Sequence, residues 1–214
     1  MKSYWKRATA LKYQFFRQSA AFVLLTGLLG LQTSAQATLA PLDAPSPVTA
    51  AASATADGSA ALRVGLPGAQ LAGSAKLTVW GFDVYRASLW VAPGFRPATY
   101  SQHAFALELA YLRKFGGNAI TERTLTEMQR QAKVTPEKTR VWRDALMAIF
   151  PDVNPGDRIT GIHQPGASTR FLVNGKPKGE IADPEFDRLF FGIWLSDATS
   201  EPALRQALLA QTPR

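Results

Sequence analysis

Residues 169–195 read TRFLVNGKPKGEIADPEFDRLFFGIWL, and they contain both kinds of element that decide the fold. Two extended runs flank Asn174-Gly175, a dipeptide that tolerates the positive φ angles of a type I′ hairpin turn. Pro177 cannot donate a backbone hydrogen bond, so its strand is expected at a sheet edge. The stretch therefore predicts an antiparallel hairpin that leads directly into a helix.

The helix is predicted over residues 183–196, with Asp183 as its N-cap and Pro184 in its first turn. Its large apolar residues recur at helical spacing and form one wide stripe: Phe186, Leu189, Phe190, Ile193 and Trp194. Asp187 and Arg188 are expected on the opposite side. This pattern indicates a helix that covers a sheet and argues against a membrane-spanning segment.

Further strands are predicted upstream at residues 61–68, 75–80, 82–92 and 104–113. One more strand, at 158–164, directly precedes the hairpin. The segment 104–113 alternates strictly and is expected to be half-buried, with Phe105, Leu107, Leu109 and Tyr111 on its inner face. A surface helix is predicted at 119–132, and a last short helix at 200–210. Between them a helix is predicted to begin with Thr135 as its N-cap and Pro136 in its first turn. Its inward face is expected to consist of Val141, Trp142, Ala145, Leu146, Ile149 and Phe150. This order favours an α+β fold, an antiparallel sheet covered on one face by helices.

The N-terminus differs from the rest of the chain. Residues 1–37 combine a basic start with a short apolar run and the small residues Ala35-Gln36-Ala37, which predicts a secretory signal peptide cleaved after Ala37. Export to the periplasm is therefore expected, without stable membrane insertion after cleavage, because the apolar run is too short to span a bilayer. Residues 38–61, rich in Ala, Pro, Ser and Thr, are expected to be a disordered tether, and residues 62–214 the folded domain.

Charge and cysteine content exclude several classes of function. Five of the 24 basic residues lie in the predicted signal peptide, so 19 basic residues face 16 acidic ones in the remainder, and a nucleic-acid partner is not expected. The chain has no cysteine, so no disulfide and no lipid attachment at a cysteine is possible. The oligomeric state is not indicated.

No motif for a cofactor, a metal or a catalytic triad is recognisable. His103 and His163 have no carboxylate at ligand spacing and are interpreted as surface or structural residues. Asp152, Asn154 and Asp157 lack the closing glutamate of a calcium loop and fit a helix-to-strand turn better. We therefore expect no cofactor and no metal.

Aromatic residues are the distinctive feature of the predicted domain. They either form an ordinary core or line an apolar pocket closed by polar tips, for which Tyr85 and Arg113 are the candidates. Arg113 could equally be a solvated strand end. The candidate ligand-binding residues are Trp80, Tyr85, Leu89, Tyr111, Arg113, Trp142, Phe190 and Trp194.

Several of these runs, among them LTVWGFDVYRASLWV, WRDALMAIFPDVNPGDRITG and FFGIWL, resemble the chalcone isomerase-like family in its bacterial exported branch. The resemblance covers about residues 71–209 and implies an open-faced β-sandwich with a ligand cleft between sheet and helices. Active isomerases of this family use an Arg, two Thr and a Tyr. The matching positions here are Leu77, Trp80, Gly192 and Pro136, none of which supplies the required charge or hydroxyl.

The resemblance thus implies the fold without the isomerase reaction. The leading hypothesis is an exported, non-catalytic domain that binds an apolar or amphipathic small molecule, such as a fatty acid, between sheet and helices. The alternatives are an isomerase with a rearranged active site, and a structural or partner-binding module without a pocket. No residue is assigned a catalytic role.

Overall fold

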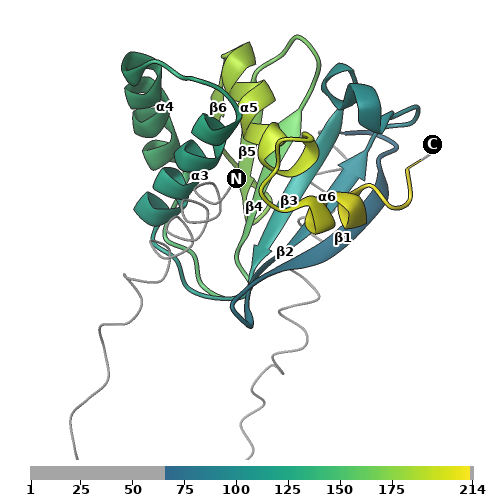
Figure 1. The fold of residues 1–214 in the computed structure, drawn as a ribbon, viewed down its shortest axis with the longest axis horizontal. Helices are drawn as coiled ribbons and strands as arrows, with labels where there is room; N and C mark the ends of the chain where they lie inside the picture. Colours follow the sequence, from purple (N-terminus) through teal and green to yellow (C-terminus); the bar gives the residue numbers. More distant parts are fainter. Residues whose placement is uncertain (1–65, 213–214) are drawn as a thin grey trace, which may run out of the picture. The chain divides into compact units, whose positions relative to one another are not determined.

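The structure is a computed structural model, and it describes residues 66–212. Six strands form one antiparallel sheet in the same order as in the sequence (Figure 1). They are β1 (Gln70–Val79), β2 (Phe82–Val91), β3 (Phe105–Tyr111), β4 (Arg158–His163), β5 (Thr169–Val173) and β6 (Lys176–Ile181). The predicted signal peptide (1–37) and tether (38–61) lie outside the described residues.

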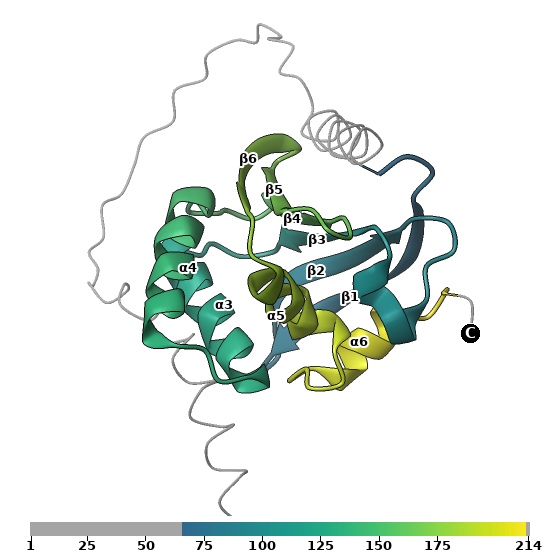
Figure 2. The same cartoon turned by 90° about the horizontal axis from the view of Figure 1, so that it is seen from above.

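The helices lie together on one face of this sheet (Figure 2). They are α3 (Gly117–Gln131), α4 (Pro136–Ile149), α5 (Pro184–Leu195) and α6 (Pro202–Leu208), and a short 3-10 helix, η1 (Pro97–Gln102), follows β2. The predicted α+β class, with helices on one face of an antiparallel sheet, is confirmed. Within residues 66–212 no helix is long and apolar enough to span a membrane.

Two glycines allow helices to approach the sheet closely. A Cβ atom at Gly73 in β1 would lie 2.2 Å from the backbone oxygen of Ala207 in α6. A Cβ atom at Gly161 in β4 would lie 3.1 Å from the ring of Phe190 in α5. The sheet therefore seats α5 and α6 at positions where any larger side chain would push them away.

Both predicted helix caps are confirmed. The Asp183 carboxylate accepts hydrogen bonds from the backbone N–H groups of Glu185 and Phe186 at 2.8 and 3.2 Å, and Thr135 Oγ1 accepts one from Lys138 N–H at 3.3 Å. The predicted inward face of α4 was wrong at Val141, which is 53% exposed. Val141 precedes the buried Trp142 by one position, so it turns away from the sheet.

The predicted hairpin and the edge position of its second strand are also confirmed. Asn174 and Gly175 have φ angles of 49° and 77°, and β6 is the last strand of the sheet. A second turn, between β1 and β2, has nearly the same backbone, with φ angles of 53° at Trp80 and 81° at Gly81. Tryptophan is an unusual residue in this left-handed conformation, which favours Asn, Asp or Gly.

Strand β3 differs from the half-buried strand predicted for it. Its alternation is correct, because Phe105, Leu107, Leu109 and Tyr111 join the core below the helices. The opposite face is buried too: Ala106 is 0% exposed, and it packs in a second cluster with Leu66, Ile162 and Leu172. Glu108 on this face is 7% exposed and is neutralised by Arg158, whose Nη1 donates to Glu108 Oε1 at 2.5 Å.

Candidate functional site

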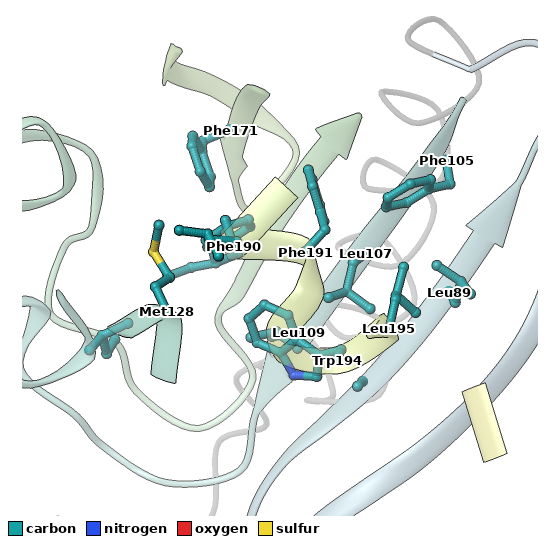
Figure 3. Close-up of a cluster of buried hydrophobic side chains, with 14 of the residues drawn as sticks. Leu89, Phe105, Leu107, Leu109, Met128, Phe171, Phe190, Phe191, Trp194 and Leu195 are labelled. Atoms are coloured by element: carbon teal, nitrogen blue, oxygen red, sulfur yellow. The ribbon is translucent and has the colours of Figure 1, made fainter. Parts of the chain in front are cut away.

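Aromatic rings of α5 fill the space between the helices and the middle of the sheet (Figure 3). The ring centroid of Phe190 lies 5.2 Å from that of Phe171 in β5, and the centroid of Phe191 lies 4.8 Å from that of Phe105 in β3. Both contacts are edge-to-face, the preferred geometry for aromatic pairs. Phe191 is fully buried although it lies outside the predicted stripe, because Gly161 leaves room for its ring.

The last turn of α5 reaches the sheet through Trp194. Its indole Nε1–H donates a hydrogen bond of 3.0 Å to the hydroxyl oxygen of Tyr85 in β2. Burial raises the pKa of Tyr85 far above its ordinary value, while the hydrogen bond from Trp194 acts in the opposite direction. Tyr85 is therefore neutral at physiological pH, and because its oxygen accepts from Trp194, its own O–H remains available as a donor.

Tyr111 in β3 lies directly opposite Tyr85 in the sheet register. The two rings meet edge-to-face, with centroids 6.1 Å apart. Tyr111 is 3% exposed, and burial raises its pKa well above the ordinary value. Its hydroxyl has no hydrogen-bond partner among residues 66–212. The hydroxyl is not among the fully buried polar atoms without a partner, which in the described residues are Trp90 Nε1 and Thr121 Oγ1, so it remains a donor that a bound group could use.

Charged residues of α3 lie close enough to act on this pair. Among the charged groups, Glu201 at the N-cap of α6 raises the Tyr85 pKa most, Arg123 of α3 lowers it, and Glu127 of α3 raises it. Glu127 itself is 6% exposed and is held between two cations, with Arg123 Nη2 at 2.7 Å and Arg130 Nη1 at 2.9 Å from its carboxylate oxygens. Tyr85 therefore has two carboxylates and one guanidinium group in its electrostatic surroundings, those of Glu201, Glu127 and Arg123. The sequence did not single out the α3 residues, since their spacing is that of ordinary helix ion pairs.

The structure brings together part of the predicted site. Tyr85, Tyr111 and Trp194 lie together, and we call these three residues the hydroxyl cluster. Phe190 contacts this cluster through Trp194, at 5.5 Å between ring centroids. Leu89 is fully buried on the same face of the sheet. Trp142 is buried at another place, where its indole donates to Asp183 Oδ2 at 3.0 Å. It anchors the start of α5 and does not belong to the cluster.

Trp80 and Arg113 lie outside the hydroxyl cluster. Trp80 occupies the turn between β1 and β2 and is 49% exposed. The Arg113 guanidinium lies over the ring of Phe82, 4.7 Å from its centroid. Arg113 lies away from the hydroxyl cluster because β3 ends at Tyr111, two residues before it, and the chain then leaves the sheet. The cation that acts on Tyr85 is Arg123 and not the predicted Arg113.

The histidines and the acidic turn have structural partners. His163 is 4% exposed, and its Nδ1 and Nε2 atoms lie 3.0 Å from Asp187 Oδ1 and from the backbone oxygen of Ser101. Asp187 therefore points to the end of β4, which corrects its predicted place on the solvent side of α5. The Asp152 carboxylate accepts from Gly117 N–H at 2.9 Å. In the described part of the chain, no three His, Asp or Glu side chains are grouped to hold a metal.

An open groove of about 1090 Å³ lies between the residues around η1 and the C-terminal helix α6. Phe95, Pro97 and Leu209 supply apolar surface, and Arg96 and Arg205 lie at its sides. None of the predicted ligand-binding residues lines this groove. Arg205 is already engaged, since it donates to the backbone oxygen of Leu195 at 2.8 Å and pairs with Asp197 at 2.9 Å.

Two of the positions matched to the isomerase residues, Leu77 and Gly192, supply neither a charge nor a hydroxyl of their own. Leu77 pairs with Tyr85 in the sheet and packs against the core. Gly192 faces Gln131 of α3, and a Cβ atom there would lie 2.2 Å from Gln131 Oε1. The Gln131 amide donates to the Leu189 backbone oxygen at 2.8 Å, so it ties α3 to α5 where active relatives are expected to place a hydroxyl.

Comparisons with known proteins agree with this architecture. An uncharacterised protein of Haemophilus influenzae is 29% identical over 143 residues, covering 65% of this chain and 67% of the relative. The crystal structure of a fatty-acid binding protein of Arabidopsis thaliana superimposes with a TM-score of 0.52 at 12% identity, covering 67% of this chain and 87% of the other, which shows a shared fold. Residues 52–210 match the sequence profile described as chalcone isomerase-like. The chain belongs to the chalcone isomerase-like family.

Proposed function

We propose that the protein is an exported, non-catalytic member of the family that binds an apolar or amphipathic small molecule between the sheet and α5. A fatty acid or a similar chain with one oxygen-bearing end is the ligand class that fits best. The fatty-acid binding protein with the same fold supports this class by analogy only, because fold does not determine function.

The observation that carries the proposal is the pair of neighbouring tyrosines below α5, of which Tyr111 is buried and Tyr85 is partly buried. Tyr85 has an O–H donor left after it accepts from Trp194, and Tyr111 uses its hydroxyl for no bond within residues 66–212. Two neutral O–H donors in an apolar interior suit a carbonyl or carboxylate oxygen. The guanidinium of Arg123 adds a positive charge in the surroundings of Tyr85, beside the carboxylates of Glu201 and Glu127.

Ligand entry requires a movement in this proposal, because side chains fill the space below α5. Trp194 sits at the C-terminal end of α5, where the chain leaves the helix at Ser196. Rotation of its indole away from Tyr85 would expose the hydroxyl pair and open apolar space beside Phe190. Trp194 would then act as the gate of the site.

The absence of suitable groups at Leu77 and Gly192 supports a non-catalytic role. An isomerase must hold a phenolate and stabilise an enolate oxygen, which needs a cation and donors at those places. We expect chalcone absorbance to decay in the presence of the protein no faster than in buffer. Faster decay would favour the isomerase with a rearranged active site.

The proposal is tested with protein purified from the periplasm of its own host or of another exporting bacterium. Native mass spectrometry should detect a bound small molecule, and calorimetry should detect binding of added C12 to C18 fatty acids. Tyr111→Phe should weaken this binding about tenfold through the loss of one hydrogen bond to a charged group. It should not lower stability, since the hydroxyl has no partner to lose.

Tyr100→Phe is the matched control. Tyr100 is a partly buried tyrosine in η1 whose ring contacts Phe105, at the opposite end of β3 from Tyr111, so Tyr100→Phe should leave binding unchanged. Empty protein that also ignores added fatty acids would favour a packed module without a ligand. The intact mass of the same preparation tests export separately, because cleavage after Ala37 predicts an N-terminus at Thr38.

A further inference from the structure

The turn between β1 and β2 has a residue that its backbone does not favour. The structure contains two turns with almost the same pair of positive φ angles, Asn174-Gly175 and Trp80-Gly81. Asparagine is a preferred residue at the first position of such a turn, and tryptophan is not. Trp80 is nevertheless held there with 49% of its surface exposed. Strain at an exposed residue indicates a role other than folding.

Other apolar side chains surround this turn. Phe82 is 47% exposed and begins β2, and Leu112 is 39% exposed and follows β3. Leu112 lies beside β2, because its backbone N–H donates to the backbone oxygen of Val84 at 3.0 Å. These side chains and Trp80 are three of the six large apolar residues that the described part of the chain exposes.

Cations accompany the apolar residues. The Arg113 guanidinium covers the Phe82 ring, and the next residue, Lys114, is exposed. The acidic residue of the hairpin, Asp83, is neutralised by Lys76 at 2.5 Å. We define the hairpin patch as Trp80, Phe82, Leu112, Arg113 and Lys114. It combines aromatic and aliphatic surface with an excess of positive charge.

We propose that the hairpin patch is a docking surface for the headgroup region of an anionic lipid bilayer. Aromatic side chains favour the membrane interface, and nearby Lys and Arg are attracted to anionic headgroups. Aromatic residues and arginine also occur at protein interfaces, so the two adjacent cations, with lysine depleted at such interfaces, are what favour the anionic bilayer here. The contact is peripheral and reversible, since the patch is small and presents no long apolar helix.

The observations that support docking are different from those that support the proposed ligand site. Docking rests on the conformation and exposure of Trp80 and on the charges beside it, and not on the hydroxyls of Tyr85 and Tyr111. The two are nevertheless compatible, because Phe82 lies three residues before Tyr85 in the same strand. Docking would bring the ends of β2 and β3 that carry the tyrosines close to a source of apolar molecules.

The test measures binding of the exported protein to phosphatidylglycerol-containing vesicles and to pure phosphatidylcholine vesicles by cosedimentation. Binding to the anionic vesicles should be clear at low salt and should weaken as salt increases. Trp80→Asn is the decisive variant, because it places the preferred residue in the turn while it removes the aromatic ring. It should fold at least as stably as the wild type and lower the partition coefficient about tenfold.

Two further variants separate the contributions. Val141→Gln removes an exposed apolar side chain from α4, far from the hairpin in sequence, and should leave vesicle binding unchanged. Lys114→Gln should weaken binding to anionic vesicles and leave any binding to phosphatidylcholine unchanged. Vesicles that contain brominated lipid should quench tryptophan fluorescence of the wild type, and Trp80→Asn should lose most of this quenching, because Trp142 and Trp194 are buried and Trp90 is partly buried.

The outcomes are distinguishable from those of the ligand proposal. Equal binding by wild type and Trp80→Asn would overturn the docking surface, as would wild-type protein that ignores anionic vesicles at low salt. Capture of a protein that depends on Trp80, without vesicle binding, would assign the hairpin patch to a protein partner and also overturn the proposal. None of these results affects the fatty-acid titration of Tyr111→Phe.

Discussion

Replacement of Asp183 by alanine should destabilise the protein by about 3 kcal/mol, because two different contributions are lost together. The first is the cap of α5, since Asp183 Oδ1 accepts from the N–H groups of Glu185 and Phe186. Loss of such a cap costs about 1 kcal/mol. The second is the partner of the Trp142 indole, which is 2% exposed and donates to Asp183 Oδ2. A buried donor left without a partner costs about 1–3 kcal/mol.

Asp183→Asn separates these contributions. Asparagine is as good a cap as aspartate, but its amide N–H₂ would face the indole N–H if its oxygen stays on the cap. We therefore expect a loss of about 1–2 kcal/mol, from the indole bond alone. In the Trp142→Phe background no indole N–H exists, so the same replacement should cost clearly less.

Urea denaturation followed by circular dichroism gives the free energies of unfolding for this double-mutant cycle. The coupling energy between Asp183 and Trp142 should be about 1 kcal/mol or more. Additive effects of the two replacements would refute the indole bond as a stabilising contact. A loss below about 0.5 kcal/mol for Asp183→Ala would refute the role of the cap as well.

Three further predictions concern stability. Burial alone would raise the pKa of Asp183, but hydrogen bonds from Trp142 and from the backbone, with the charge of Lys138, lower it below its ordinary value of 3.8. The stability difference between wild type and Asp183→Ala should thus be constant near neutral pH and shrink below about pH 4; a difference that persists at pH 2 would contradict this. Gly161→Ala should cost about 1–3 kcal/mol in urea denaturation, because its Cβ would press on the rings of α5, and a neutral effect would show that α5 yields freely. Thr121→Val should raise stability by about 1 kcal/mol, because the buried Thr121 hydroxyl has no partner in the described residues, and a lower melting temperature would indicate a hidden partner.

Local rules predicted those elements whose cause lies in neighbouring residues. The caps Thr135 and Asp183, the Asn174-Gly175 turn and the edge strand with Pro177 depend on backbone hydrogen bonds within a few positions. Their structure therefore followed from the sequence.

Features that depend on a distant partner were not predictable in this way. The second buried face of β3 depends on Leu66, Ile162 and Leu172, which come from other parts of the chain. The full burial of Phe191 depends on the glycine at position 161 of another strand. In both cases the pattern of a strand or helix indicates which face of the element a residue lies on. Which residues of other elements cover that face depends on the sheet register and on the packing of the helices, which the pattern does not contain.

The candidate site was predictable in part for the same reason. Alternation placed Tyr111 on the inner face of its strand, and helical spacing placed Trp194 on the inner face of α5, whereas the pairing of Tyr111 with Tyr85 depends on the sheet register. Arg113 was the predicted cation, and Arg123 was not among the predicted site residues. Long arginine side chains reach several residues, so their partners depend on the tertiary arrangement.

The most direct measurement is a crystal structure of the exported protein with a fatty acid that carries bromine at the end of its chain. The account predicts a carboxylate oxygen within hydrogen-bond distance of the Tyr85 and Tyr111 hydroxyls, with Trp194 rotated, and an anomalous bromine signal between α5 and the sheet. A bromine signal in the groove between Phe95 and Leu209, or protein without bound ligand, would contradict it.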